Sequence, residues 1–363
     1  MSSSPARLKY LPQLDSFRFF AVFLVIIYHW FPNNRINLIP NGYLGVTFFF
    51  VLSGFLISSN LLYQKRELDK GLISFGKAIK TFYIRRTLRI FPLYFLVIFL
   101  VFALVPLAFE GHFLWYVTYA PNFLFFRIHE WPGMLSHFWS LGVEEQFYLI
   151  WPFLILIIPL KFLKYLFPAI IGLSIIFKFI FFKYSGSFFS FYDVLPISCF
   201  DAFGIGALLA LHILEANKFS HFLSRIPVGL GILGAVIMAC FIYFFGISYL
   251  FGLAVSIASF YFILGAIRGY KGLLAVIINN QVIRYLGKIS YGLYVYHNFI
   301  PWLLRCIKGE ETAYPLSIHI INPACIQSPI TSFFIQCLLL VAIASLSWTF
   351  IERPINNLKK YFV

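Results

Sequence analysis

The chain has 363 residues, of which 61% are hydrophobic and only 11% are charged. Soluble globular domains carry about 25% charged residues, so this composition excludes a soluble enzyme and indicates a membrane protein with several spans. The formal net charge is +15, and in so apolar a chain it indicates Lys and Arg gathered in cytoplasmic loops and no nucleic-acid partner.

Ten apolar windows of the sequence predict membrane-spanning helices. They cover residues 14–31, 43–62, 91–109, 141–160, 166–183, 197–213, 228–245, 248–267, 288–305 and 331–351. We therefore expect an all-α, polytopic membrane helical bundle of about ten transmembrane helices. It is predicted to form a single domain over residues 1–363, with its core over about residues 10–355 and no separate soluble domain.

Lys and Arg are distributed unevenly among the predicted loops. They are dense in the loops on the side of the two termini, whereas the opposite loops hold few, among them Arg35, Arg127 and Lys183. Short loops rich in Lys and Arg stay in the cytoplasm, so both termini are predicted to be cytoplasmic. On this topology residues 64–90 form a long cytoplasmic loop, and residues 110–140 lie outside.

The first predicted span, residues 14–31, carries Asp15 and Arg18 near its start and His29 near its end. Arg18 and His29 are 11 positions apart, which on an α-helix places them on one face with a rise of about 16 Å between them. Ionisable groups in a membrane helix are costly and commonly mark a functional site. The alternative is that Arg18 extends to the lipid headgroups and His29 lies in the opposite interface.

The predicted cytoplasmic loop ends in the sequence FYIRRTLRIFP, and Pro92 at its end is expected to begin the third span. Arg86 and Arg89 are three residues apart and would share one helix face. Guanidinium groups suit two-point contacts with phosphate, so the pair is a candidate clamp for a phosphorylated cytosolic ligand. The alternative is an anchor that contacts lipid phosphates.

The stretch SHFWSLGVEEQFYLIWP enters the fourth span and holds two adjacent carboxylates, Glu144 and Glu145. Neighbouring residues of a helix point to different faces, so we expect only one of them to face the bundle interior. A buried carboxylate near an imidazole can orient a base or shuttle a proton. The alternative is that both glutamates are solvated at the outer interface.

Three further candidate side chains are Asp201, His297 and Tyr294. Asp201 stands at the outer end of the sixth span, either as a cap or packing residue or facing a substrate. His297 lies in the predicted ninth span near Tyr294. Its side chain is either hydrogen-bonded by neighbouring side chains or part of a site.

The five cysteines show no paired motif, so neither a disulfide nor a metal site is predicted.

Five stretches, taken together and in this order, resemble the acyltransferase-3 family of bacterial integral membrane O-acyltransferases, which includes O-antigen acetylases. They are LDSFR followed by His29, GYLGVTFFFVLSGFLIS, RRTLRIFPLY, FWSLGVEEQFYLIWP and ISYGLYVYH. The resemblance covers about residues 10–355. One departure is visible, because the family often carries Arg two residues before the acid that matches Asp201, and this chain has Cys199 there.

The resemblance implies transfer of an acyl group, such as acetyl, from cytosolic acyl-CoA to a hydroxyl. The implied acceptor is a cell-surface or exported carbohydrate or glycolipid, such as O-antigen or exopolysaccharide, and the implied location is the lipid bilayer of the bacterial inner membrane. Arg18, Arg86 and Arg89 match residues expected to bind the donor, which is a substrate and not a resident cofactor. His29 and Glu144 match residues expected to be catalytic.

The expected geometry agrees with this function. Basic groups near the cytosolic ends of the first and third spans would meet CoA phosphates, and His29 would take a proton from the acceptor hydroxyl. Glu144 is expected to orient that imidazole. The alternative is a proton-coupled transporter or flippase of a glycan or lipid, which would predict an inverted repeat that the sequence does not show. A third interpretation is an interaction or sensor protein without chemistry.

Overall fold

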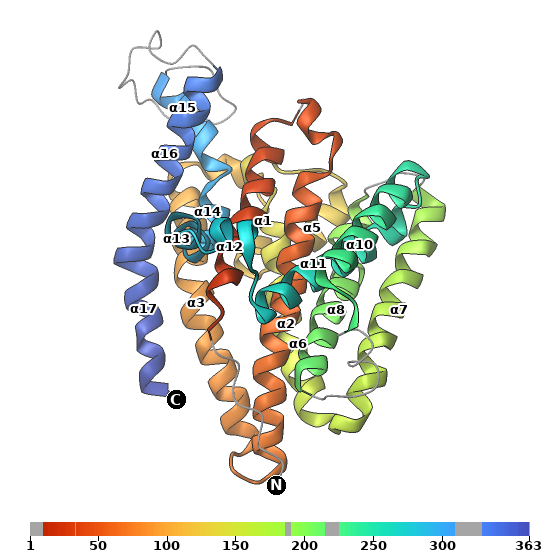
Figure 1. The fold of residues 1–363 in the computed structure, drawn as a ribbon. Coiled ribbons are helices and arrows are strands. Elements are labelled where there is room, and N and C mark those ends of the chain that lie inside the picture. The colour runs from red at the N-terminus through yellow and green to blue at the C-terminus, as the bar shows by residue number, and fades with distance from the viewer. Residues whose placement is uncertain (1–9, 33, 186–189, 215–224, 309–328, 363) are drawn as a thin grey trace.

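The computed structural model describes residues 10–32, 34–185, 190–214, 225–308 and 329–362, and within these ranges the regular elements are all helices (Figure 1). The longer ones are α1 (Pro12–Trp30), α2 (Asn41–Asp69), α3 (Phe75–Leu104), α6 (Phe138–Ile157), α7 (Leu160–Ser185), α8 (Pro196–Leu214), α10 (Val228–Phe244), α11 (Ser248–Arg268) and α16 (Pro329–Ser347). The shorter ones are η1 (Arg35–Leu38), η2 (Pro106–Phe109), α4 (Phe113–Val117), α5 (Pro121–Ile128), η3 (Gly133–Leu135), η4 (Phe191–Val194), α12 (Gly272–Ile278), α13 (Gln281–Lys288), α14 (Ser290–Tyr296), α15 (Phe299–Lys308), the π-helix η6 (Trp348–Glu352), α17 (Arg353–Asn357) and η7 (Leu358–Phe362).

The all-α, polytopic membrane architecture is confirmed. In the described ranges, seven helices are long and apolar enough to cross a membrane: α2, α3, α6 with the turn before it, α7, α8, α11, and α16 with its continuation. Of the three other predicted spans, α1 has 19 residues but is less apolar, α10 has 17 residues, and residues 288–305 do not form one helix. A count of ten transmembrane helices therefore stays a prediction.

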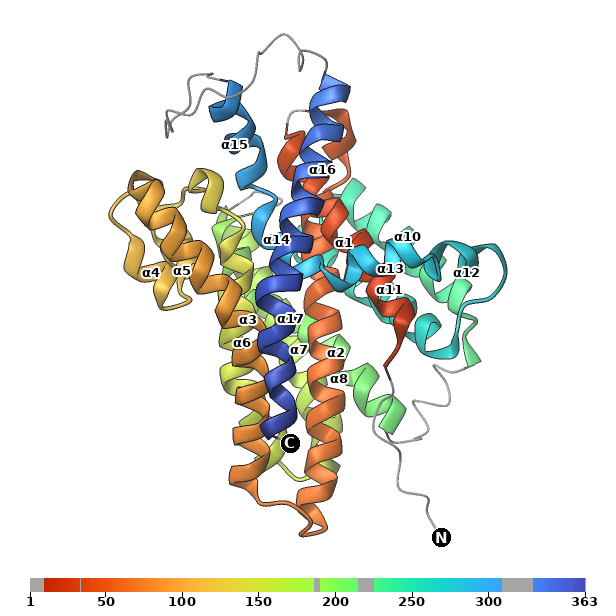
Figure 2. The same ribbon diagram turned by 90° about the vertical axis from the view of Figure 1, so that its left-hand side faces the viewer.

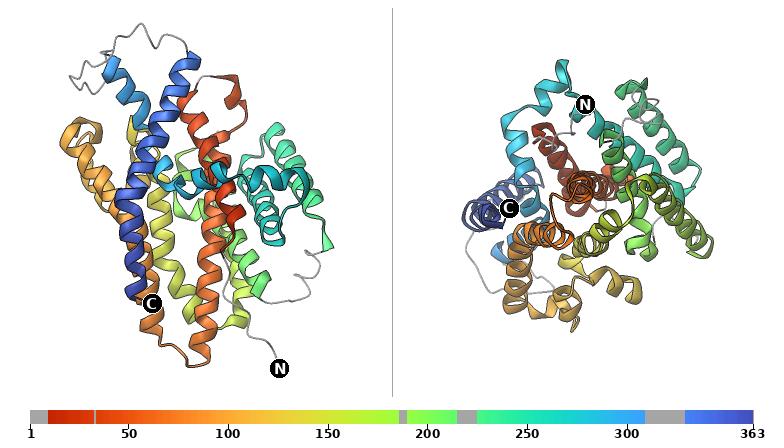
Figure 3. Two further views of the ribbon diagram at one scale, coloured as in Figure 1. Left: turned by 60° about the vertical axis from the view of Figure 1, so that its left-hand side comes forward. Right: turned by 90° about the horizontal axis from the view of Figure 1, so that it is seen from below.

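Helix α2 is the common neighbour of the bundle. It contacts α1, α3, α6, α8 and α11, and seen from below it lies near the centre of the molecule (Figure 3). Glycines permit this: a Cβ on Gly45 would lie 2.4 Å from the backbone oxygen of Ala21 in α1, and one on Gly54 would lie 2.3 Å from that of Phe203 in α8. At both places only a residue without a side chain lets the two backbones approach so closely.

Residues 64–90 are not a long loop, contrary to the prediction. Helix α2 continues to Asp69 and α3 begins at Phe75, where the Ser74 side chain accepts a hydrogen bond from the Lys77 N–H at 3.2 Å. Pro92 lies inside α3 and does not start it. The error has a simple cause: Lys and Arg lower hydropathy, but they are good helix formers, so a helix extends past its apolar stretch.

The predicted ninth span, residues 288–305, is also wrong as one helix. It is divided into the end of α13, then α14, then α15, and His297 lies at the turn between α14 and α15. Helix α13 crosses the start of α1 so closely that a Cβ on Gly287 would be 1.6 Å from the backbone oxygen of Asp15. A hydropathy window does not record such a change of direction.

The two ends of α1 lie at different depths of the bundle. Figure 2 shows α1 beginning about halfway along α2 and running toward the end of the molecule that carries α15. The α2–α3 turn and the C-terminal α17 point toward the opposite end. Arg18 is therefore held inside the bundle, next to the middle of α2 and α3.

Candidate functional site

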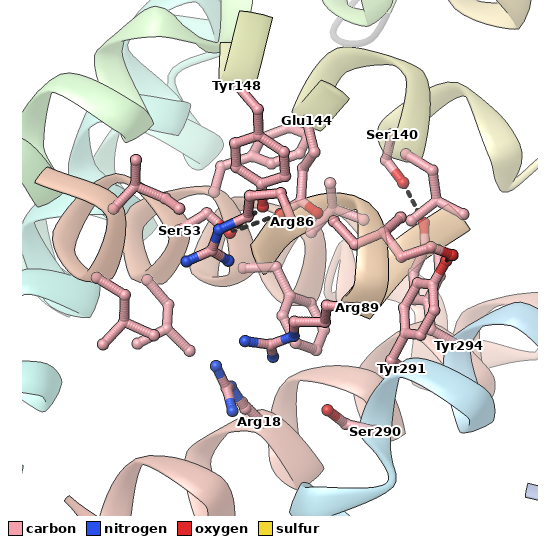
Figure 4. Close-up of a pocket in the computed structure, with 18 residues that line it drawn as sticks. Arg18, Ser53, Arg86, Arg89, Ser140, Glu144, Tyr148, Ser290, Tyr291 and Tyr294 are labelled. Carbon is pink, nitrogen blue, oxygen red and sulfur yellow. Dashed lines mark hydrogen bonds between the residues drawn. The ribbon is translucent and has the colours of Figure 1, made fainter. Parts of the chain in front are cut away.

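An inner cavity of about 90 Å³, partly open, lies between α1, α2, α3, α6 and α14 (Figure 4). Its wall is lined by Arg18, Val46, Phe49, Phe50, Leu52, Ser53, Leu56, Ile57, Arg86, Arg89, Ile90, Ser140, Leu141, Glu144, Tyr148, Ser290, Tyr291 and Tyr294. Three of the predicted residues from two separate helices, Arg18, Arg86 and Arg89, thus line one space together with Glu144.

The three guanidinium groups point toward one another across this cavity (Figure 4). Arg18 has a paired acid, since its Nη1 lies 3.2 Å from Oδ1 of the buried Asp15. In the part of the chain that the structure describes, neither Arg86 nor Arg89 has a carboxylate oxygen within 4.0 Å. Removing like charges from water without pairing them is costly, so this arrangement favours an anionic ligand.

The two glutamates occupy different environments. Glu144 lines the inner cavity, and its Oε1 accepts a hydrogen bond from the Ser53 hydroxyl at 2.7 Å; the Tyr148 hydroxyl lies 3.3 Å from the same Ser53 oxygen. Glu145 lines neither of the cavities described here, and its Oε1 is buried without a hydrogen-bond partner among the described residues. The structure thus places one of the two in the interior site, as adjacent positions on a helix require.

A second, outer cavity of about 870 Å³, also partly open, adjoins the first. Aromatic rings and polar groups share its wall, which includes Tyr28, His29, Asn37, Tyr43, Val46, Phe50, His129, Trp131, Ser136, His137, Trp139, Lys178, Phe191, Tyr192, Asp193, Asp201, Tyr243 and Tyr294. Arg18 and His29 of one helix therefore face two different cavities, the inner one and the outer one respectively.

Three histidines form a cluster beside the outer cavity, and two of them, His29 and His137, line it. Nδ1 of His29 lies 3.0 Å from the Val25 oxygen and 3.2 Å from Nε2 of His297, and Nδ1 of His297 lies 2.6 Å from the Tyr294 oxygen. The His137 ring meets that of His297 edge-on, with 4.8 Å between the ring centroids. A carbonyl can only accept, so Nδ1 carries the proton in both His29 and His297. In neutral His29 the basic lone pair is therefore on Nε2.

This environment differs from the expected one. Glu144 was expected to orient the His29 imidazole, but it lines the inner cavity and accepts a hydrogen bond from Ser53; among the described residues, the side chain within hydrogen-bond distance of the His29 ring is His297. The buried His297 lies between α14 and α15, where its backbone N–H still donates to the Leu293 oxygen at 3.1 Å. Tyr294, another predicted candidate, lines both cavities and donates from its hydroxyl to the His137 oxygen at 3.1 Å.

Asp201 forms a buried ion pair at the outer cavity. Its Oδ2 lies 2.7 Å from Nζ of Lys178 in α7, and its Oδ1 accepts a hydrogen bond from the Ala202 N–H at 2.9 Å. Sequence reasoning missed Lys178, although a lysine inside the predicted span 166–183 is itself a signal of function. Asp201 is thus paired with a cation from another helix, while position 199, where the family often carries Arg, is Cys.

Comparisons with known proteins agree with the sequence resemblance. A family model described as an acyltransferase domain matches residues 11–350. The putative peptidoglycan O-acetyltransferase YrhL of Bacillus subtilis is 28% identical over 380 residues, covering 96% of this chain and 55% of the relative. The peptidoglycan O-acetyltransferase OatA of Listeria monocytogenes is 29% identical over 387 residues, covering 98% and 57% respectively.

The O-acetyltransferase OatA of Staphylococcus aureus is likewise 29% identical over 391 residues, covering 96% of this chain and 58% of that protein. No solved structure matches. The chain thus spans slightly more than half the length of these relatives.

Proposed function

Because the chain belongs to the acyltransferase-3 family, we propose that it is a membrane O-acetyltransferase. The donor is acetyl-CoA from the cytosol, and the acceptor is a hydroxyl of a cell-surface or exported glycan. The relatives named above include peptidoglycan O-acetyltransferases, which modify a cell-wall glycan. The membrane is the bacterial cytoplasmic membrane.

The observation that carries this proposal is the convergence of Arg18, Arg86 and Arg89 on one cavity. CoA bears a diphosphate and a further phosphate, and guanidinium groups bind such oxygens in two places at once. Asp15 keeps Arg18 in position through the 3.2 Å ion pair, while Arg86 and Arg89 keep their charges for the ligand. The inner cavity is thus the donor site.

His29 is the proposed general base. Its Nδ1–H is held by the Val25 oxygen and by Nε2 of His297, which leaves Nε2 to take the proton of the acceptor hydroxyl. In the overall reaction the hydroxyl oxygen bonds to the thioester carbonyl carbon, the carbon–sulfur bond breaks, and the proton is passed on to the CoA thiolate. His297 positions the base and holds its tautomer.

The outer cavity is the proposed acceptor site. Sugar rings present apolar C–H faces and many hydroxyls, and this cavity offers rings such as Trp131 and Trp139 beside polar groups such as Asn37 and the Lys178–Asp201 pair. The transporter alternative lacks such support, because the relatives matched are acetyltransferases and the sequence has no inverted repeat.

The test is acetyl transfer by the purified full-length protein in lipid vesicles, with acetyl-CoA as donor and an N-acetylglucosamine oligosaccharide as acceptor. Arg89→Gln should raise KM for acetyl-CoA about 10- to 100-fold, the usual loss for one charge-assisted contact, and should leave KM for the acceptor nearly unchanged. The matched control is Arg85→Gln, which removes a guanidinium from the same helix outside the cavity.

Two results would refute the proposal. One is wild-type protein that releases no CoA and forms no acetyl ester with acetyl-CoA. The other is an Arg89→Gln protein whose KM for acetyl-CoA equals that of the Arg85→Gln control, because the arginines would then serve only as membrane anchors.

A further inference from the structure

The proposed donor and acceptor cavities share part of their walls. Within the described residues, three side chains line both cavities: Val46 and Phe50 of α2 and Tyr294 of α14. We call these three residues the partition. The inner cavity holds the arginines and the outer one holds His29, so a group that passes from a donor at the arginines to a hydroxyl at His29 must cross this place.

Two members of the partition are fixed by their neighbours. The Phe50 ring is 3% exposed, lies 4.9 Å from the Phe203 ring, and meets Trp139 edge-on at 6.1 Å. The Tyr294 hydroxyl is hydrogen-bonded to the Ser140 hydroxyl and also donates to the His137 oxygen at 3.1 Å. Neither ring can swing aside without losing packing or hydrogen bonds.

Val46 is the small member, and its backbone is also fixed. The neighbouring Gly45 lies against α1 so tightly that a Cβ there would be 2.4 Å from the Ala21 oxygen, so α2 cannot move toward α1 at this point. A β-branched side chain has few rotamers to choose from. With the two rings and the α2 backbone held in place, the size of the Val46 side chain is the remaining variable at the partition.

We propose that Val46 limits the length of the acyl chain that the protein transfers, so that acetyl passes the partition and chains with additional methylenes are disfavoured. This inference rests on the proposed function, which it deepens by naming the residue that selects the acyl group. A pocket that must accommodate one methylene too many commonly discriminates by about 10- to 200-fold. The selection acts on the acyl chain alone, since the phosphates of every acyl-CoA meet the same arginines.

The experiment compares acetyl-CoA with butyryl-CoA as donors for the full-length protein in lipid vesicles, with the N-acetylglucosamine oligosaccharide as acceptor. The readout is the ratio of kcat/KM for butyryl transfer to that for acetyl transfer. Val46→Ala should raise this ratio at least about tenfold. Val51→Ala is the matched control, because it removes the same atoms from a buried valine of the same helix that lines neither cavity, and its ratio should equal that of the wild type.

A second variant changes the partition in the opposite direction and does not depend on the first one folding. Val46→Ile adds one methylene and should lower the ratio for propionyl-CoA over acetyl-CoA. The inference would be overturned if acetyl transfer is intact, the butyryl-to-acetyl ratio of Val46→Ala equals that of the wild type, and the propionyl-to-acetyl ratio of Val46→Ile does so too. That result would leave the proposed function standing. Absence of acetyl transfer in the wild type would instead overturn the proposed function itself.

Discussion

At the scale of single residues, the proposed mechanism separates binding of the donor from transfer of the proton. The guanidinium groups of Arg18, Arg86 and Arg89 line the inner cavity, and the His29 imidazole lines the outer one. A substitution in the inner cavity should therefore alter acetyl-CoA binding, whereas a substitution of His29 should alter kcat. This division gives a test for the role of His29.

We expect His29→Ala to lower kcat for acetyl transfer by about 10²–10⁴-fold, the usual contribution of a general base, and to leave acetyl-CoA binding within about twofold of wild type. The binding should persist because no arginine of the inner cavity contacts His29 in the described structure. Equilibrium binding of acetyl-CoA and single-turnover transfer by the purified protein measure the two quantities separately.

The control for this change is His212→Ala, which removes an imidazole of α8 that lines neither cavity. Its transfer rate should match that of the wild type. Turnover of His29→Ala within a factor of three of this control would remove His29 from the mechanism and leave the outer cavity without its proposed base.

Single residues also show how far the sequence could predict the site. Arg18, His29 and Glu144 were recognisable as ionisable groups in or next to apolar stretches, where they are costly. The partner of His29 was not, because His297 lies 268 positions away and reaches it only through the break after α14. Pairings of this kind depend on tertiary packing, which hydropathy and spacing along one helix do not contain.

At the scale of elements, most apolar windows became helices close to their predicted bounds. The windows at 197–213 and 248–267, for example, correspond to α8 (Pro196–Leu214) and α11 (Ser248–Arg268). The prediction failed where a helix continued into charged sequence, as in α3, or where an apolar stretch changed direction, as after α13. Apolar composition reports burial in lipid, whereas helix length and direction follow from backbone hydrogen bonds and neighbouring helices.

The packing of α2 against α8 provides the second prediction. Gly54→Ala should destabilise the protein by about 1–3 kcal/mol, the usual cost of overpacking, because the new Cβ would lie 2.3–2.9 Å from backbone atoms of Phe203. Those backbone atoms can make room only if the two helices separate. The thermal unfolding midpoint of the protein in lipid or detergent measures the effect.

Gly234→Ala is the matched control, since Gly234 lies within α10 and a Cβ there meets nothing within 4 Å. Because Ala is the better helix former by about 1 kcal/mol, this variant should be as stable as the wild type or slightly more so. Equal midpoints for the two alanine variants would show that the α2–α8 contact tolerates a side chain.

At the scale of the whole molecule, charge and the two cavities define a direction across the membrane. The α2–α3 turn, the α6–α7 turn and the C-terminal helices carry many basic residues, among them Lys65, Arg66, Lys161, Lys164 and Lys360, and they lie at one end of the bundle (Figure 1). Arg86 lies 11 residues into α3, about 17 Å from its start. His29 lies at the far end of α1, so the inner cavity, the proposed donor site, is nearer to the basic end.

This polarity gives the last prediction, the orientation of the protein. Short basic segments remain in the cytoplasm, so the α2–α3 turn and the C-terminal helices should be cytoplasmic, with α4 and α5 on the outer side. In a cysteine-free background, Leu72→Cys and Lys360→Cys should react with a membrane-impermeant maleimide only after the cells are opened, and Glu130→Cys should react in intact cells. All three side chains are exposed, so a failure to react reports location and not burial.

Labelling of Leu72→Cys in intact cells would show the opposite orientation, which would put the arginine cavity out of reach of cytosolic acetyl-CoA. Labelling of Glu130→Cys alone in intact cells would instead place the proposed donor and acceptor cavities on the two sides that the reaction requires.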